Sequence, residues 1–194
     1  MKSVLISIHP KRCDLIASGR ETIEAQKTCP KIETPFKCYI YETKARSDMP
    51  TFVDEDGHVI YTGRGQVIGE FVCDNVEVLF DTNGNPENYM TDILPSILQK
   101  TALSYDEFGA YVGSRADKNS IYGWHISELK IYDKPRELSD FKTSPCEKSE
   151  KSCGKCKYLV KIDTPDMHEV DCFVKNGREI TCPPQSWMYV EVYK

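Results

Sequence analysis

Residues 3–27 limit the fold more than any other stretch, because they predict a strand, a short helix and a second strand. Apolar residues alternate over residues 3–8, which is the period of a strand with one buried face. Pro10 suits the first position of a helix, where its missing N–H costs nothing. Gly19 suits the position just after a helix end, because glycine readily adopts the left-handed conformation. A second strand is then expected over residues 22–26, after a tight corner.

Two glutamates, Glu21 and Glu24, lie at or beside this predicted corner, together with Gln26. Carboxyl groups three residues apart can act as a general acid and a general base. On an exposed strand end, however, such residues are more often a solvated pair. We therefore expect solvated side chains here, with acid and base roles as the alternative.

The corner resembles the signature GxKxxExR of the ASCH superfamily, which consists of small PUA-like β-barrels. Gly19 and Glu24 occupy the glycine and glutamate positions, while Glu21 stands in place of the lysine and Gln26 in place of the arginine. Four further blocks are similar to a phage and prophage branch of that family: CYIYETK (38–44), QVIGEFVCD (66–74), YGWHISELKIYDKP (122–135) and PPQSWMYVEVY (183–193). The resemblance implies an α+β fold built as a mostly antiparallel β-barrel with short helices.

Periodicity along the rest of the chain agrees with a protein of five or six strands and short helices. The expected elements are strands over 36–43, 66–80, 124–132 and 187–193, a weak helix over 87–100, a helix over 104–112 and a hairpin at Asp56-Gly57. The helix over 104–112 begins with a capping box at Ser104 and Glu107. A break near Asp74-Asn75 would let one long β run serve two edges of a barrel.

The sequence changes character between residues 142 and 182, where cysteine, lysine, serine and glutamate become frequent. We interpret this stretch as an insert into a barrel made of residues 1–141 and 183–194. Within it, Cys153 and Cys156 form a CxxC pair that can bind one tetrahedral zinc ion. Cys146 and Cys172 are the expected remaining ligands, with His168 and Cys182 in reserve. Four thiolates would leave no open position for water, so the Zn²⁺ is expected to be structural; a redox pair is the alternative.

The composition is ordinary for a globular protein, with 40% hydrophobic and 28% charged residues. No apolar run is long enough to cross a membrane, and the first residues do not resemble a secretory signal, so we expect a cytoplasmic protein. Without an oxidising compartment, the nine cysteines are not a disulfide framework. Cys13, Cys38 and Cys73 lie in apolar patterns and are expected to be buried as small hydrophobic residues. The net charge of −5 does not suggest a nucleic-acid binder, but basic residues near the corner could still form a basic face.

The candidate ligand-binding residues come from blocks expected to converge at one end of the barrel. They are Lys11, Arg12, Arg20, Tyr41, Trp124, His125, Gln185 and Ser186. Aromatic side chains can stack on unpaired bases, and basic side chains can hold phosphates. For Trp124 the alternative is core packing, and for His125 it is an ordinary surface position. The prediction that follows is a cleft beside Gly19 that binds RNA or a nucleotide-like ligand.

Two other functions remain open from the sequence. Some ASCH members hydrolyse N4-acetylated cytidine, and the resemblance implies that they use a lysine and a threonine near the corner. Glu21 and Glu24 stand at those positions here, so a hydrolase of a modified nucleoside or RNA would rely on Glu24 with Lys44 or Lys11 as its cation. The third hypothesis is a phage-encoded protein whose insert binds a protein partner.

Overall fold

The computed structural model describes residues 3–44, 63–80, 94–113, 120–144 and 177–192. Its strands are β1 Ser3–Ile8, β2 Ile23–Gln26, β3 Phe36–Glu42, β4 Gln66–Cys73, β5 Val76–Phe80, β6 Ile121–His125, β7 Ser127–Arg136, β8 Phe141–Thr143 and β9 Trp187–Val192. Its helices are α1 Pro10–Ala17, α3 Leu94–Thr101, α4 Tyr105–Gly113 and the short 3-10 helix η2 Leu138–Asp140. Residues 87–93, the predicted hairpin at Asp56-Gly57 and the central part of the predicted insert lie outside the described residues.

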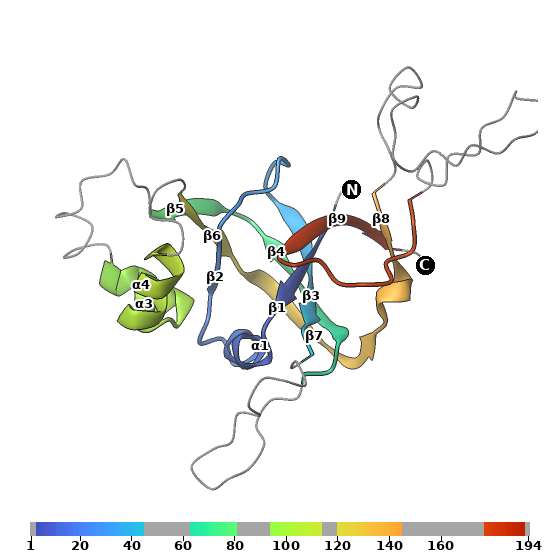
Figure 1. Ribbon diagram of the computed structural model, residues 1–194, viewed down its shortest axis with the longest axis horizontal. Helices are drawn as coiled ribbons and strands as arrows, with labels where there is room; N and C mark the ends of the chain where they lie inside the picture. The colour runs from blue at the N-terminus through green and yellow to red at the C-terminus, as the bar shows by residue number, and fades with distance from the viewer. Residues whose placement is uncertain (1–2, 45–62, 81–93, 114–119, 145–176, 193–194) are drawn as a thin grey trace, which may run out of the picture.

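The described strands form two sheets, as Figure 1 shows. The larger sheet has the order β7-β4-β3-β1-β9-β8, and the smaller sheet has the order β2-β6-β5. Only the pair of β1 and β3 is parallel among these strand pairs; the others are antiparallel. The expected α+β class is confirmed. The single closed barrel is not found among the described strands, because β2 pairs with β6 and not with an edge of the larger sheet.

Two breaks carry the chain from one sheet to the other. The first lies at Asp74-Asn75, between β4 of the larger sheet and β5 of the smaller one, as the sequence predicted. The second lies at Ile126, between β6 and β7, where Glu128 adopts a positive φ of 47°. The sequence predicted one strand over 124–132, but its apolar positions shift phase from Trp124 and Ile126 to Leu129 and Ile131. In the structure this shift marks the crossing between the two sheets.

The first strand, helix and second strand form as predicted. Pro10 begins α1, and the His9 imidazole accepts a hydrogen bond from the Lys11 amide at the helix start. Gly19 follows the helix with φ of +70°, and a Cβ atom at this position would have no atom within 4 Å apart from its own chain neighbours. The helix end thus needs the left-handed conformation and not the small size of glycine.

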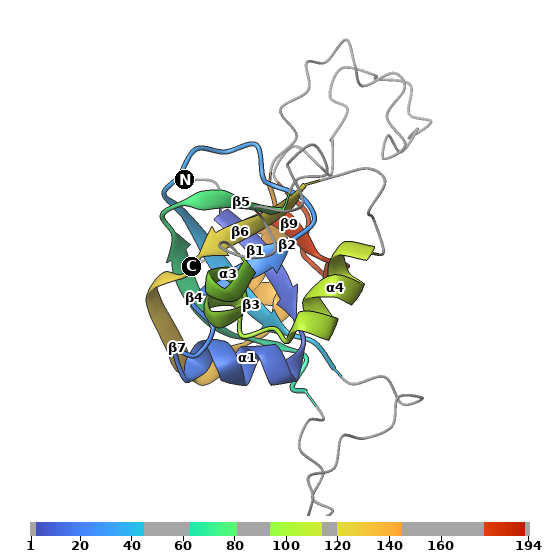
Figure 2. The ribbon, with the colours of Figure 1, turned by 90° about the vertical axis from the view of Figure 1, so that its left-hand side faces the viewer.

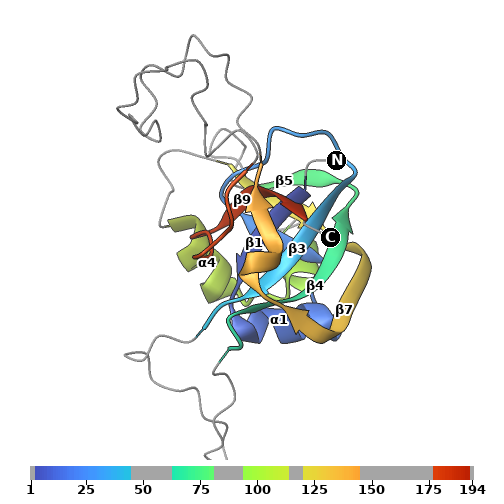
Figure 3. The ribbon, with the colours of Figure 1, turned by 90° about the vertical axis from the view of Figure 1, so that its right-hand side faces the viewer.

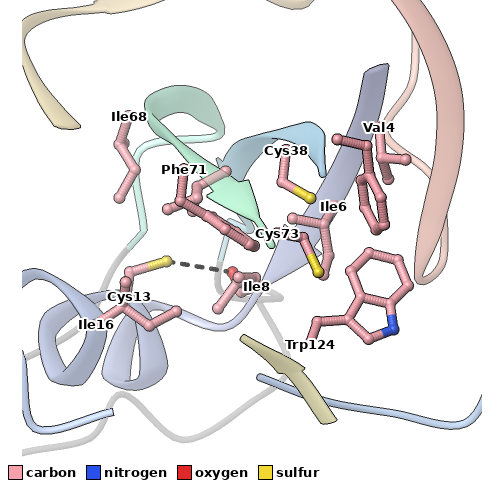
Figure 4. Close-up of a cluster of buried hydrophobic side chains, with 12 residues drawn as sticks. Val4, Ile6, Ile8, Cys13, Ile16, Cys38, Ile68, Phe71, Cys73 and Trp124 are labelled. Atoms are coloured by element: carbon pink, nitrogen blue, oxygen red, sulfur yellow. Dashed lines mark hydrogen bonds between the residues drawn. The ribbon is translucent and has the colours of Figure 1, made fainter. Parts of the chain in front are cut away.

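The main core lies between the larger sheet, α1 and the end of β6 that carries Trp124 (Figure 4). It contains Trp124, whose ring is fully buried, and Phe71. Cys13, Cys38 and Cys73 are buried free thiols in this region, which confirms their expected role as small hydrophobic residues. The dashed line in Figure 4 joins the Cys13 thiol to the Ile8 carbonyl oxygen, at 3.7 Å.

Helices α3 and α4 lie against the smaller sheet (Figure 2) and share a second core with it. The capping box predicted at α4 is present in both directions. The Glu107 amide donates to Ser104 Oγ at 3.1 Å, and the Ser104 amide donates to Glu107 Oε2 at 2.9 Å. Phe108, Tyr111 and Val112 face this core, as expected from the sequence.

The described ends of the predicted insert lie beside the larger sheet (Figure 3). Lys142 in β8 pairs with Glu191 in β9, so the first end is part of that sheet. The returning chain forms a bridge from Glu179 to Lys142, and Ile180 is buried beside Phe141 and Val190 in a third core. The second end is therefore held against β8.

Among the described helices, none has the length and apolar character needed to span a bilayer.

Candidate functional site

A cleft of about 500 Å³ lies beside the corner formed by α1 and β2. Its walls come from the end of β1, the start of α1, β2, α4 and the segment before β9. The lining residues are Ser7, Ile8, His9, Arg12, Glu24, Ala25, Gln26, Lys27, Thr28, Leu103, Tyr111, Gln185 and Ser186. A volume of this size is typical of sites for small organic ligands.

The segment before β9 reaches the cleft because it continues the pairing of β9 with β1. The Ser7 amide donates to the Ser186 carbonyl at 2.8 Å, one step beyond the paired strands. The Ser7 hydroxyl donates to the Pro184 carbonyl at 2.7 Å. These two bonds hold Gln185 and Ser186 over the end of β1, so residues almost at opposite ends of the sequence share one wall.

A chain of hydrogen bonds crosses the cleft from this segment to β2. Ser186 Oγ donates to Gln26 Oε1 at 2.7 Å, and Gln26 Nε2 donates to Glu24 Oε1 at 2.8 Å. Gln26 and Glu24 are 6% and 8% exposed, so these polar groups are buried beneath the cleft. Glu24 Oε2 is also buried and has no hydrogen-bond donor among the described residues.

Glu21 lies below Glu24 and is 1% exposed. Its Oε1 forms an ion pair with Arg12 Nη2 at 2.5 Å. The same Arg12 nitrogen donates to the Thr101 carbonyl at 2.6 Å, which ties α1 to the end of α3. The expectation of a solvated glutamate pair was wrong. Glu21 is buried against Arg12, and Glu24 lies in β2 opposite Trp124 with only 8% of its surface exposed.

Burial and a neighbouring carboxyl group raise the pKa of Glu21. Burial is the largest cause and the charge of Glu24 is the next, while Arg12 opposes the rise. Both effects favour the protonated form of the Glu21 side chain.

One wall of the cleft carries an aromatic ring. The Tyr111 hydroxyl donates to the Ala25 carbonyl at 3.0 Å, and Lys27 Nζ lies 4.6 Å from the centre of the ring. On the other side, the indole N–H of Trp187 donates to Thr28 Oγ1 at 2.9 Å. The pKa of His9 is lowered by burial and by the charge of Lys11, so its imidazole is neutral at pH 7.

The structure brings four of the sequence-predicted site residues into this cleft. They are Arg12, Glu24, Gln185 and Ser186. Arg12 reaches it from α1, Glu24 from β2, and the other two from the segment before β9. These four come from two separate stretches of the sequence, residues 3–27 and 183–193, and the resemblance to one family is what suggested that the two stretches converge.

The other predicted site residues lie elsewhere and do not line the cleft in the described part of the chain. Lys11 is exposed and forms an ion pair with Glu107 at 3.3 Å, while Arg20 is exposed beside Ser18. Lys44 is exposed beside Gly65 at the far end of β3.

Two aromatic candidates and one histidine also lie away from the cleft. Tyr41 is 5% exposed and belongs to the third core, with Phe141 and Val190. Trp124 is packed against Phe36 and Trp187. His125 Nε2 lies 3.0 Å from Glu77 Oε1 at the edge of the smaller sheet. The core-packing alternative for Trp124 is the one that the structure shows.

Lys27 and Tyr111 line the cleft but are not among the site residues predicted from the sequence. Tyr111 carries a weak signal, because it follows the helical spacing of α4 and was assigned to the core. Lys27 carries none, since one lysine after a short strand is ordinary. Only the docking of α4 beside β2 brings the two side chains together.

The predicted zinc ligands Cys146, Cys153, Cys156 and Cys172 and the reserve ligand His168 lie outside the described residues. Cys182 is described and exposed. Within the part of the chain that the structure describes, no three His, Cys, Asp or Glu side chains are grouped to hold a metal ion.

The fold and the site together define an α+β protein with a polar cleft between a strand corner and a returning C-terminal segment. Among solved structures, the chain is similar to ASCH from Zymomonas mobilis, with 18% identity and a TM-score of 0.47 over 70% of this chain and 73% of that chain. It is similar to a tyrosine-to-phenylalanine mutant of the same protein, with 16% identity and a TM-score of 0.47 over 71% and 77% of the two chains. No protein-family model matches the sequence, and no curated protein matches it closely.

Proposed function

We propose that this chain is an ASCH-type, PUA-like protein that binds RNA or a nucleotide-like ligand in the cleft beside Gly19. The observation that carries the proposal is the cleft itself, which has the volume of a small-ligand site and combines an aromatic wall with cationic and hydrogen-bonding groups. Lys27 Nζ lies over one face of the Tyr111 ring, so the two side chains together offer a cation and an aromatic ring to a nucleotide. Two of the stretches that resemble the ASCH family contribute lining residues, including Glu24 from the corner and Ser186 from residues 183–193.

The test is binding of a fluorescently labelled oligoribonucleotide, followed by anisotropy at several salt concentrations. We expect binding that weakens as salt rises, because phosphate contacts release counterions. Tyr111→Leu removes the ring and should weaken binding by about tenfold or more, since stacking on a base contributes roughly 1–3 kcal/mol. Tyr111→Phe keeps the ring and is the matched control. Binding that is absent, or equal in both variants, would count against this cleft.

A second candidate function is hydrolysis of a modified nucleoside or RNA. The observation that favours it is the buried pair of Glu21 and Glu24, in which burial and the charge of Glu24 raise the pKa of Glu21. A protonated acid beside a second carboxyl group is a suitable arrangement for general acid and base catalysis. Lys44 and Lys11 do not line the cleft, so the cation next to the pair is Arg12.

This candidate is tested by the release of cytidine from N4-acetylcytidine, with an active family member as a positive control. Turnover that disappears in Glu24→Gln while ligand binding persists would establish the enzyme. No turnover beside a working control would retire this reaction and leave binding as the function.

The remaining parts of the proposal rest on the sequence alone. They are a cytoplasmic location, a relation to the phage and prophage branch, a structural zinc ion in the insert and a protein partner for that insert. The cysteine spacing supports the zinc ion, because two thiolates separated by two residues can bind one tetrahedral ion.

A further inference from the structure

The directions of the hydrogen bonds around the cleft restrict what a ligand can offer to its floor. The side-chain amide of Gln26 ends in one oxygen and one nitrogen atom, and Glu24 Oε1 lies 2.8 Å from one of these two atoms. That atom must be the amide nitrogen, because a carbonyl oxygen there would face another acceptor. The Gln26 oxygen therefore faces Ser186.

Ser186 consequently uses its single proton inside the protein. Its hydroxyl donates to Gln26 Oε1 at 2.7 Å, so only lone pairs remain for a ligand. Ser7 is in the same position, because its hydroxyl donates to the Pro184 carbonyl at 2.7 Å. Glu24 accepts from Gln26. All three side chains line the cleft.

Ser7, Glu24 and Ser186 thus form an edge of hydrogen-bond acceptors, which we name the acceptor edge. We propose that the acceptor edge binds the exocyclic amino group of a base, so that the cleft prefers amino bases to their oxo counterparts. The inference rests on the proposed function, since it concerns a nucleotide bound in the same cleft.

The chemistry of the bases explains the preference. Cytosine and adenine present an amino group that can donate to acceptors. Uracil and hypoxanthine carry a carbonyl oxygen at the equivalent position, which would face the acceptors and lose its hydrogen bonds to water. Sites built around one hydrogen-bonding pattern reject the mismatched analogue strongly. We expect a preference of about tenfold or more.

The experiment compares two matched pairs of ligands: cytidine with uridine monophosphate, and adenosine with inosine monophosphate. Each competes with the labelled oligoribonucleotide at one pH and one salt concentration. The expected result is tighter binding of the amino member in both pairs. Ser186→Ala should reduce the preference several-fold, whereas Ser186→Thr keeps the hydroxyl and should preserve it.

The outcomes separate this inference from the proposed function. If the oligoribonucleotide binds but the two members of each pair compete equally, or the oxo member competes better, the inference is overturned and the binding function stands. If neither the oligoribonucleotide nor any monophosphate binds, both are overturned. The comparison within the unmodified protein holds even if a serine variant fails to fold.

Discussion

Glu21 is an acidic residue in a place where a charge is costly. It is 1% exposed, and among the described residues the opposite charge that offsets the penalty of burial is that of Arg12. The neighbouring Glu24 carboxyl group makes a second negative charge less favourable still. Protonation of Glu21 lowers this cost, which is why the pKa of Glu21 is raised. The protonation of Glu21 therefore contributes to the stability of the corner.

Substitution Glu21→Gln should remove a dependence of stability on pH. The folded protein keeps a proton that the unfolded chain releases above about pH 4.5, the ordinary pKa of this group. Stability contributed by that proton is complete below pH 4.5 and is lost as the pH rises toward the raised folded-state pKa, with a slope of at most about 1.4 kcal/mol per pH unit. Urea unfolding of both proteins from pH 5 to pH 8 measures the difference.

Relative to Glu21→Gln, the unmodified protein should therefore lose stability as the pH rises over this range. Glu107→Gln is the matched control. The pKa of Glu107 is lowered, mainly by the hydrogen bond from the Ser104 amide, so its contribution is lost only as the pH falls below about 4.5 and should stay nearly constant from pH 5 to pH 8. If the difference in free energy of unfolding between the unmodified protein and Glu21→Gln does not change with pH, Glu21 is ionised in the folded protein.

At the scale of elements, helix α4 depends on its first turn for stability. Ser104→Ala removes the side-chain acceptor for the Glu107 amide and should destabilise the protein by about 1 kcal/mol. Ser104→Thr retains a hydroxyl and should have a smaller effect. Thermal unfolding of the two variants and the unmodified protein makes the comparison. Equal stability of all three would show that α4 is held by its packing against the smaller sheet alone.

Two glycines in regular elements should respond to alanine in opposite directions. A side-chain carbon at Gly69 in β4 would lie 2.6 Å from the Lys130 carbonyl oxygen, so the β7 backbone would have to move. We expect Gly69→Ala to cost about 2 kcal/mol or more. Gly109 in α4 has open space around it, and Gly109→Ala should stabilise the helix by about 0.5–1 kcal/mol. Chemical unfolding that gives both variants the same sign would contradict this.

Strand β1 and helices α1 and α4 were the easiest elements of the fold to predict. Local signals determine them: alternation in β1, proline and glycine at the ends of α1, and a capping box at α4. The ends of these elements in the structure agree with the ends predicted from the sequence to within one or two residues. Glu21 was harder, because its burial depends on where the turn after Gly19 points the chain, and no periodic pattern carries that information.

At the scale of the whole molecule, the breaks between strands decide whether the strands form one barrel or two sheets. The sequence signalled both irregularities, at Asp74-Asn75 and near Ile126, and assigned them to bends of one barrel. In the structure each break carries the chain between two sheets. Whether a bent strand closes one sheet or joins two is decided by long-range pairing, such as that of β2 with β6, which a local pattern does not contain.

The candidate site shows the same division between local and long-range information. Arg12 and Glu24 lie near the corner in the sequence, so the corner itself made them candidates. Gln185 and Ser186 could be selected only through the resemblance of their block to a family. Tyr111 reaches the cleft through the docking of α4, and neither source of information pointed to it.

The zinc prediction concerns the relation between the insert and the rest of the molecule. The chain enters residues 145–176 from β8, which pairs with β9, and returns beside β8 with Ile180 buried. A structural zinc ion would therefore order the insert without being needed for the two sheets. Elemental analysis of the purified protein should find about one zinc per chain, as expected for one four-cysteine site.

The double substitution Cys153→Ser and Cys156→Ser should remove this zinc, because it deletes half of the predicted ligands. Cys29→Ser is the matched control, since Cys29 is an exposed thiol outside the insert and should leave the zinc in place. Removing the metal with a chelator should speed proteolysis within residues 145–176 and leave the melting of the remaining structure nearly unchanged. Zinc that persists in the double variant would exclude this ligand set. A protein that contains no zinc, with Cys153 and Cys156 joined in a disulfide, would favour the redox alternative instead.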